Sequence, residues 1–390
     1  MSGDDDLPVV TGAWLEGQNP GRRRFIDIGA VDLERGGRLP EVRMAYQSWG
    51  TLDATASNAV LIEHALTGDS HVIGSAGQGQ PSPGWWEGLV GPGRAIDTGR
   101  WFVVAANVIG GCQGTTGPSS LAPDGRAWGS RFPFVTIRDQ VEAERLLAEA
   151  VGVDHWALVI GGSMGGMRVI EWAVSHPDRV HQAIVLASTA AATADQIAWS
   201  QPQLLAIRQD PHFNGGDYYD TDRGPASGLG LARRIAQITY RSAGELDDRF
   251  GREPQSGEDP LGGRGRYAIE SYLDYHADKL GRRFDANTYL VLTEAMNSHD
   301  VGRDRGGIEA ALGRVRAHVT AVAVDSDRLY RPEQSAQLAA LVPEGHLRTI
   351  HSTCGHDGFL IEVDQVGAIV RDALRHVHDG EGAPDGGSIR

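Results

Sequence analysis

The sequence predicts an α/β protein with a mostly parallel sheet, helices on both faces of that sheet, and a helical insertion. First, short apolar runs of strand length alternate with segments of helical periodicity over most of the chain. Second, the apolar run at residues 157–160 leads directly into a glycine-flanked serine and then into a helical segment. Third, strand-like runs vanish between residues 188 and 313, where only helical patterns occur.

The first half of the chain supplies most of the expected sheet. Two strands, at residues 25–28 and 42–47, should pair antiparallel at a sheet edge. A helix is expected at residues 136–150, with Thr136 as its N-cap and apolar residues at helical spacing. The remaining strands are continuous apolar runs, as in buried parallel strands, at residues 59–63, 101–106, 157–160 and 183–187.

The second half begins with the insertion, whose helices are expected near residues 195–208, 230–240, 267–279 and 286–296. A polar loop at residues 251–265 contains five glycines and is expected to be mobile. The α/β pattern then resumes, with strands and helices alternating at residues 319–324, 332–341, 347–350 and 362–376. We therefore expect an α/β core at residues 1–187 and 314–378, a helical lid at 188–313 and a disordered tail at 379–390.

Charge and cysteine content restrict the classes of function. The 390-residue chain has a net charge of −15, which argues against a nucleic-acid or anionic membrane surface. Lys279 is the only lysine, and Cys112 and Cys354 are the only cysteines, so neither a disulfide framework nor a C-x-x-C metal site is expected. We expect a cytoplasmic protein, because the sequence contains neither the apolar segment of a signal peptide nor a run long enough to span a membrane.

Residues 161–166, Gly-Gly-Ser-Met-Gly-Gly, form a G-x-S-x-G pattern between a strand and a helix. Such a turn forces its serine into a strained backbone conformation, and side chains at the flanking glycines would clash across it. The serine Oγ is then exposed at the carboxyl end of the sheet, near a helix N-terminus that favours negative charge. A glycine-rich turn that merely packs tightly is the alternative, but the legible strand and helix favour Ser163 as a nucleophile.

A nucleophilic serine needs a base, and the base needs an orienting carboxylate. Asp325 and Asp327 follow the strand at residues 319–324, and the residues alone do not choose between them. His356 lies between the last strand and the last helix, where the base belongs in this architecture. A solvated or capping loop histidine is the alternative, but its place in the chain after the serine and the aspartates favours the catalytic interpretation.

The loop at residues 64–69 follows a buried strand and contains small residues and a glycine. Such a loop can present backbone N–H groups to an oxyanion. Taken alone, it is more simply an ordinary connection between a strand and a helix.

Longer motifs carry a resemblance to a known family. They include H-A-L-T-G-D-S-H-V at residues 64–72, G-G-S-M-G-G at 161–166, D-P-H-F-N-G-G-D-Y at 210–218, A-R-R-I-A-Q-I-T-Y-R-S at 232–242, S-D-R-L-Y at 326–330 and G-H-D-G-F-L at 355–360. With them, the chain resembles the homoserine O-acetyltransferases, α/β-hydrolase-fold enzymes of methionine biosynthesis, from about residue 25 to residue 374. The motifs of the insertion are the most specific, because generic hydrolases share only the G-x-S-x-G turn.

The resemblance implies roles for individual residues. It implies Asp327, the aspartate of S-D-x-L, as the triad acid in preference to Asp325. Arg331 departs from the family pattern, which usually has proline directly after the aromatic residue of this loop, and this departure concerns the local loop shape. The implied site comprises the triad Ser163, Asp327 and His356, the oxyanion-hole amides of Leu66 and Met164, and the substrate contacts Arg233 and Asp357.

Elementary chemistry is consistent with the implied substrate contacts. Homoserine carries a carboxylate, which suits a planar arginine fork such as Arg233, and an ammonium group, which suits a carboxylate such as Asp357. The alternatives are a surface helix cation for Arg233, as expected for its neighbour Arg234, and a loop residue capping the next helix for Asp357.

The resemblance implies acetyl transfer from acetyl-CoA to the γ-hydroxyl of L-homoserine through an acetyl-serine enzyme. CoA is then a cosubstrate, no bound cofactor or metal is implied, and a homodimer built through the lid helices is expected. Succinyl-CoA as donor, L-serine as acceptor and a plain serine esterase are alternatives on the same fold. A non-catalytic binding protein is a further alternative, which the joint presence of Ser163, Asp327 and His356 disfavours.

Overall fold

The computed structural model describes residues 10–379, which fold around an eight-stranded sheet in the order β1-β2-β4-β3-β5-β6-β7-β8. β1 pairs antiparallel with β2, and β2 with β4, while all other neighbours are parallel. The predicted α/β class with a mostly parallel sheet is therefore confirmed. The strands are β1 (Arg24–Asp32), β2 (Arg38–Trp49), β3 (Ala59–Glu63), β4 (Phe102–Ala106), β5 (Trp156–Gly162), β6 (Val180–Leu186), β7 (His318–Val324) and β8 (Gly345–Ile350).

Successive side chains of β5 point to opposite faces of the sheet, so each face has its own core. Val159 packs with residues of α1 (Ile137–Ala150), α2 (Met164–Ser175) and α9 (Pro332–Leu341). Its neighbours Leu158 and Ile160 pack on the other face, against α11 (Val363–Asp379) and the irregular segment that contains Trp86 and Leu89.

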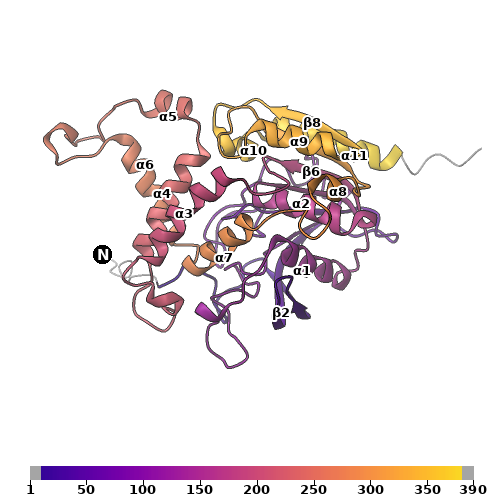
Figure 1. The fold of residues 1–390 in the computed structure, drawn as a ribbon, viewed down its shortest axis with the longest axis horizontal. Coiled ribbons are helices and arrows are strands. Elements are labelled where there is room, and N and C mark those ends of the chain that lie inside the picture. Colours follow the sequence, from indigo (N-terminus) through magenta and orange to yellow (C-terminus); the bar gives the residue numbers. More distant parts are fainter. Residues whose placement is uncertain (1–9, 380–390) are drawn as a thin grey trace, which may run out of the picture.

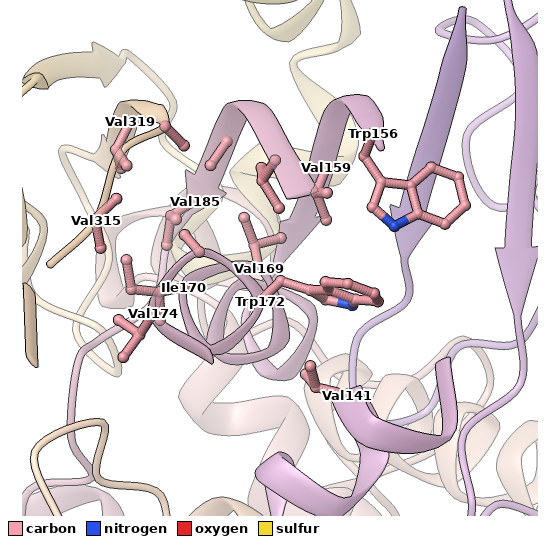
Figure 2. Close-up of a cluster of buried hydrophobic side chains, with 14 of the residues drawn as sticks. Val141, Trp156, Val159, Val169, Ile170, Trp172, Val174, Val185, Val315 and Val319 are labelled. Carbon is pink, nitrogen blue, oxygen red and sulfur yellow. The ribbon is translucent and has the colours of Figure 1, made fainter. Parts of the chain in front are cut away.

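Two tryptophans anchor the first of these cores. Trp156 at the start of β5 and Trp172 of α2 meet edge to face, with ring centroids 6.3 Å apart. Valines from β5, β6, β7 and α2 fill the space beside them (Figure 2). This packing fixes α2 against the sheet and so fixes the turn that precedes α2.

Between β6 and β7 the chain forms six helices within the described residues (Figure 1). Figure 1 shows α3, α4, α5 and α6 together at one end of the molecule, beyond the sheet. The helices are α3 (Ala194–Arg208), α4 (Ala226–Tyr240), α5 (Ala243–Phe250), α6 (Ala268–Gly281), α7 (Ala286–Asn297) and α8 (Ile308–Leu312).

The segment at residues 188–313, which was expected to form a lid, packs partly on itself and partly in the core. α3 and α4 pack on each other and on α6 and α7, whereas α8 buries Ala311 and Leu312 in the core beside α2. The division of the chain into a core at 1–187 and 314–378 and a lid remains a prediction. The expected disordered tail at 379–390 lies outside the described residues, apart from Asp379, which ends α11.

Individual elements agree closely with expectation. Thr136 caps α1 in a capping box with Asp139. The short helices α5 and α8 were not predicted; α5 has no buried residue, and α8 spans only five residues. No helix within residues 10–379 is long and apolar enough to cross a membrane.

Candidate active site

Ser163 occupies a strained turn between β5 and α2. Its backbone has φ 57° and ψ −122°, a conformation that residues with side chains rarely adopt. The flanking glycines permit the turn, because a Cβ atom on Gly165 would lie 2.2 Å from the carbonyl oxygen of Glu63 and one on Gly161 would lie 2.6 Å from the Glu63 Cβ. The Ser163 hydroxyl therefore stands at the carboxyl end of β5 and at the N-terminus of α2.

The structure brings His356 and Asp327 together. His356 Nδ1 lies 2.6 Å from Asp327 Oδ2, and both side chains are buried. The other carboxylate oxygen of Asp327 accepts hydrogen bonds from the backbone N–H groups of Leu329 and Tyr330 at 2.8 and 2.9 Å. Since an ionised carboxylate only accepts, Nδ1 carries the proton, which leaves Nε2 as the ring nitrogen free to accept one.

Asp325 has other partners. Its carboxylate lies 2.9 Å from Nδ1 of the exposed His351 and accepts a hydrogen bond from the Ser352 N–H at 3.0 Å. The two aspartates at the end of β7 are therefore separated in space, and the structure places Asp327 rather than Asp325 against His356.

Aromatic rings enclose His356. Tyr330 stacks on the imidazole with centroids 5.0 Å apart, and Tyr240 and Phe359 lie at 5.8 and 5.5 Å. Burial lowers the pKa of His356, but the charge of Asp327, its hydrogen bond and the nearby Asp357 outweigh burial and raise this pKa above its ordinary value of 6.5.

Tyr330 also contacts the serine. Burial raises the pKa of the Tyr330 hydroxyl, whereas a hydrogen bond with the Ser163 side chain lowers it. Tyr330 thus lines the cavity that contains Ser163 and also stacks on His356, so the serine and the histidine share this neighbour. The sequence did not predict a role for Tyr330 or Tyr240, although both lie inside family motifs, at residues 326–330 and 232–242.

The two expected oxyanion amides lie next to the serine. Met164 follows Ser163 and is the first residue of α2, and the first four N–H groups of a helix have no acceptor within it. Leu66 lines the same small cavity as Ser163. The carbonyls on either side of Leu66 are fixed: Arg168 donates to His64 O at 2.5 Å, and Arg283 donates twice to Thr67 O at 2.6 and 2.7 Å.

Arg233 of α4 has buried nitrogens without a partner. Its Nε and one terminal nitrogen are inaccessible to solvent and make no hydrogen bond within the described part of the chain. Its guanidinium lies 5.3 Å from the ring centroid of Tyr240, which in turn faces His356. Arg234 behaves differently, because it pairs with Asp274 of α6 at 2.7 Å. Arg233 is thus a desolvated cation available to an anionic group.

Asp357 follows His356 and is largely buried. Burial raises the pKa of its carboxyl group, against the lowering effects of Arg241, His356 and Arg233. Arg241 Nε lies 3.3 Å from Asp357 Oδ2, an ion pair that sequence analysis missed because the partners are 116 positions apart. Asp357 thus follows His356 directly, and the charge of Arg233 acts on Asp357. No group of three or more metal-binding side chains lies together within residues 10–379.

Comparisons with known proteins agree with this geometry. A sequence profile described as alpha/beta hydrolase fold matches residues 58–363. The homoserine O-acetyltransferase of Thermobifida fusca is 59% identical over 96% of this chain and 100% of that protein. The homoserine O-acetyltransferase of Mycolicibacterium smegmatis is 53% identical over 90% of this chain and 92% of that protein.

The chain belongs to the homoserine O-acetyltransferase family.

Solved structures of other proteins share the fold of this chain. A homoserine O-acetyltransferase from Bacillus anthracis aligns with a TM-score of 0.83 at 26% identity, covering 90% of this chain and 97% of that chain. Esterase E22 aligns nearly as well, with a TM-score of 0.82 at 27% identity, covering 90% and 99%. Acyltransferases and esterases therefore share this fold, and the fold alone does not determine the acyl acceptor.

Proposed function

We propose that this protein is a homoserine O-acetyltransferase that acts through an acetyl-Ser163 intermediate. The observation that carries the proposal is the buried His356–Asp327 pair beside a serine held at φ 57°. The unpartnered guanidinium of Arg233 adds a site for an acceptor that bears a carboxylate. Acetyl-CoA is a cosubstrate in this reaction, and no bound cofactor or metal takes part.

In the first half-reaction, the Ser163 Oγ attacks the thioester carbonyl carbon of acetyl-CoA while His356 Nε2 takes the hydroxyl proton. The carbonyl oxygen becomes an oxyanion that accepts hydrogen bonds from the N–H groups of Leu66 and Met164. One such donor is worth about 3 kcal/mol of transition-state stabilisation. The carbon–sulfur bond then breaks, and the CoA thiolate takes the proton from His356.

In the second half-reaction, the γ-hydroxyl of L-homoserine attacks the acetyl carbon while His356 again takes a proton. The bond between the acetyl carbon and Ser163 Oγ breaks, and the proton passes from His356 to Ser163. O-acetyl-L-homoserine leaves, and the enzyme returns to its starting state. Asp327 holds the imidazole in the required tautomer and stabilises its cationic form throughout.

Two charged residues, Arg233 and Asp357, recognise the acceptor. Arg233 binds the homoserine carboxylate, because its desolvated nitrogens have no protein partner. Asp357 binds the ammonium group while keeping Arg241 as its second partner. Water has neither charge, so this pair favours transfer to an amino acid over hydrolysis.

The expected assembly is a homodimer formed through the lid helices. This expectation is based on the family resemblance and on exposed apolar side chains of α3 and α4, such as Leu231 and Ile238. The expected compartment is the cytoplasm, which agrees with two cysteines that are both free.

Mass spectrometry of the intact protein tests the covalent step. Incubation with acetyl-CoA alone should add one acetyl group to the wild-type protein and none to Ser163→Ala. Peptide mapping should place the group on Ser163. An acetyl adduct on another residue, with Ser163 unmodified, overturns the assignment of the nucleophile.

Substrate choice is tested by measuring CoA release with each donor and each acceptor. Acetyl-CoA with L-homoserine should give the highest kcat/KM among the combinations of acetyl-CoA or succinyl-CoA with L-homoserine or L-serine. Faster release with succinyl-CoA or L-serine would assign a different acyl transfer. Release that L-homoserine does not accelerate would assign an esterase or thioesterase.

A further inference from the structure

A groove leads outward from the site along α6. It consists of two adjacent hollows of about 350 and 390 Å³, which share the lining residues Pro81, Ser82, Lys279 and Arg283. At its inner end the groove is lined by Ala65 and Thr67, the neighbours of the oxyanion residue Leu66. Its outer end lies over the exposed face of α6. The cavity that contains Ser163 lies on the other side of this loop, with Leu66 in its wall.

The groove is cationic in a chain whose net charge is −15. Its lining includes two carboxylates, Asp69 and Asp278, and four cationic side chains. Lys279, Arg282 and Arg283 remain for the donor, since the proposed function assigns Arg233 to the acceptor. The half-buried His276 lies in its wall. Burial and the charges of Arg233, Lys279, Arg241 and Arg249 lower the pKa of His276 to about 4.

The outer cations are free to bind a ligand. Arg283 is committed to the Thr67 carbonyl and lies 3.8 Å from Asp69. Lys279 and Arg282, by contrast, form no ion pair with a carboxylate within residues 10–379. They follow Tyr275 by four and seven positions and so share one side of α6 and its end. Tyr275 is 60% exposed, and Lys279 Nζ lies 6.0 Å from its ring centroid.

We propose that this groove binds the phosphorylated adenosine end of CoA, with Lys279 and Arg282 contacting phosphates and Tyr275 stacking on the adenine ring. Phosphates favour unpaired cations, and an exposed aromatic ring offers a stacking face to any base. The inner hollow ends at Ala65 and Thr67, the neighbours of Leu66, which lines the Ser163 cavity. The assignment rests on the proposed function, because it takes acetyl-CoA as the donor.

Binding is tested by calorimetric titration with adenosine 3′,5′-bisphosphate, which carries the phosphates and the base but no acyl group. The wild-type protein should bind it, and added salt should weaken that binding. The double variant Lys279→Ala with Arg282→Ala should bind about 3- to 30-fold more weakly, as expected for losing two exposed ionic contacts. Tyr275→Ala should also weaken binding, and Lys279→Arg should restore most of the affinity lost in Lys279→Ala.

Arg371→Ala is the matched control, because Arg371 is an exposed arginine of α11, at the other end of the molecule from α6 (Figure 1). It should bind the bisphosphate as the wild-type protein does. Equal weakening in Arg371→Ala would reveal a general charge effect and overturn the assignment. Inorganic phosphate that displaces the bisphosphate at equal concentration would also overturn it, since the groove would then be a simple anion site.

Kinetics separates this proposal from the proposed function. In the double variant, kcat/KM for acetyl-CoA divided by kcat/KM for p-nitrophenyl acetate, a donor without phosphates, should fall about 3- to 30-fold. If the wild-type protein is acetylated by p-nitrophenyl acetate but not by acetyl-CoA, the proposed function fails. If the wild-type protein uses acetyl-CoA and the ratio is unchanged in the variant, only the groove assignment fails.

Discussion

Single residues in this site differ in role according to their partners rather than their type. Asp325 and Asp327 are two positions apart at the end of β7, yet one faces the exposed His351 and the other the buried His356. Arg233 and Arg234 are adjacent in α4, yet only Arg234 has a carboxylate partner. In each pair, one residue is the test position, and the other is a control with the same charge at a neighbouring position in the chain.

Asp327→Asn should reduce kcat far more than Asp325→Asn. An asparagine at position 327 neither stabilises the cationic imidazole nor fixes the tautomer, a loss that can reach about 10⁴-fold in kcat. Asp325→Asn removes only an exposed contact with His351 and should change kcat less than about threefold. Steady-state kinetics of both variants checks this, and a larger loss in Asp325→Asn would assign the triad acid to Asp325.

On the acid side of the pH profile, the limb where the rate rises with pH should reflect deprotonation of His356. Acylation needs the neutral imidazole, and the pKa of His356 is raised, so the rate should rise with pH through an apparent pKa above 6.5. In Asp327→Asn the attraction of the carboxylate is lost and burial lowers the pKa, so the limb should move to lower pH. CoA release measured from pH 5 to 9 checks both profiles. An unmoved limb in the variant would assign the titration to another group.

Arg233→Ala should impair the second half-reaction selectively. Loss of a charge-assisted contact with the carboxylate should lower kcat/KM for homoserine by about 30- to 1000-fold. The pre-steady-state burst of CoA should survive, because the thioester half-reaction does not use this contact, and slow hydrolysis of the acetyl-enzyme should continue. Arg234→Ala is the control and should retain normal kcat/KM. Loss of the burst in a folded Arg233→Ala protein would assign Arg233 to the donor or to the architecture.

The triad candidates could be predicted because they lie at the ends of strands. Ser163, Asp327 and His356 each follow a strand, and parallel strands bring their carboxyl ends to one edge, so sequence order and spacing sufficed to nominate them. The choice of Asp327 over Asp325 needed the family resemblance. Tyr240 and Arg241 lie in the family motif at residues 232–242, but their roles depend on how α4 packs over the sheet, which no local pattern encodes.

At the scale of elements, a buried ionic cluster joins α2 to its surroundings. Arg168 of α2 lies 2.5 Å from Glu63 of β3 and 2.6 Å from Glu144 of α1, and all three side chains are fully buried. Glu144 also accepts a hydrogen bond from Trp172 at 3.0 Å. Through its bond to His64 O, Arg168 connects this cluster to the loop that carries Leu66.

Arg168→Met should destabilise the protein by about 3–5 kcal/mol, because it leaves buried carboxylates without their cation. Arg145→Met is the control, since Arg145 forms partly exposed pairs with Glu142 and Glu149 that are worth at most about 1 kcal/mol. Urea unfolding of both variants measures the difference. Equal unfolding free energies would mean that the cluster contributes nothing net to stability.

The sequence predicts elements best where they are buried. β3 and α9 have the bounds expected from their patterns, because a buried strand is an uninterrupted apolar run and α9 starts at Pro332. β1 extends beyond the expected residues 25–28 to Arg24–Asp32, across two irregularities in its pairing with β2. At this exposed edge the alternation is imperfect, and pairing rather than composition sets the length.

At the scale of the whole molecule, the projecting helices carry apolar side chains that face solvent. Large side chains of α3 and α4 are more than one-third exposed, namely Ile197, Trp199, Leu205, Leu231 and Ile238. Single exposed apolar residues are ordinary, whereas five on two helices that pack against each other are the basis on which we predict a contact surface.

The protein should be a homodimer at micromolar concentration, and Leu231→Asp combined with Ile238→Asp should make it monomeric. Two buried charges without partners cost more than an interface of this kind gains. Leu347→Asp is the control, because Leu347 is 42% exposed on β8, an edge strand of the sheet outside the lid helices. Multi-angle light scattering measures the mass. A monomeric wild-type protein would reject the assembly.

The single lysine gives the molecule a property that most proteins of this size lack. Apart from the amino terminus, Lys279 is the only primary amine in the chain, and it lies where the two hollows of the groove meet. An amine-reactive dye therefore attaches at one internal position without any engineered cysteine. Because labelling consumes the Lys279 ammonium that we propose contacts phosphate, a ligand already bound in the groove should slow attachment of the dye.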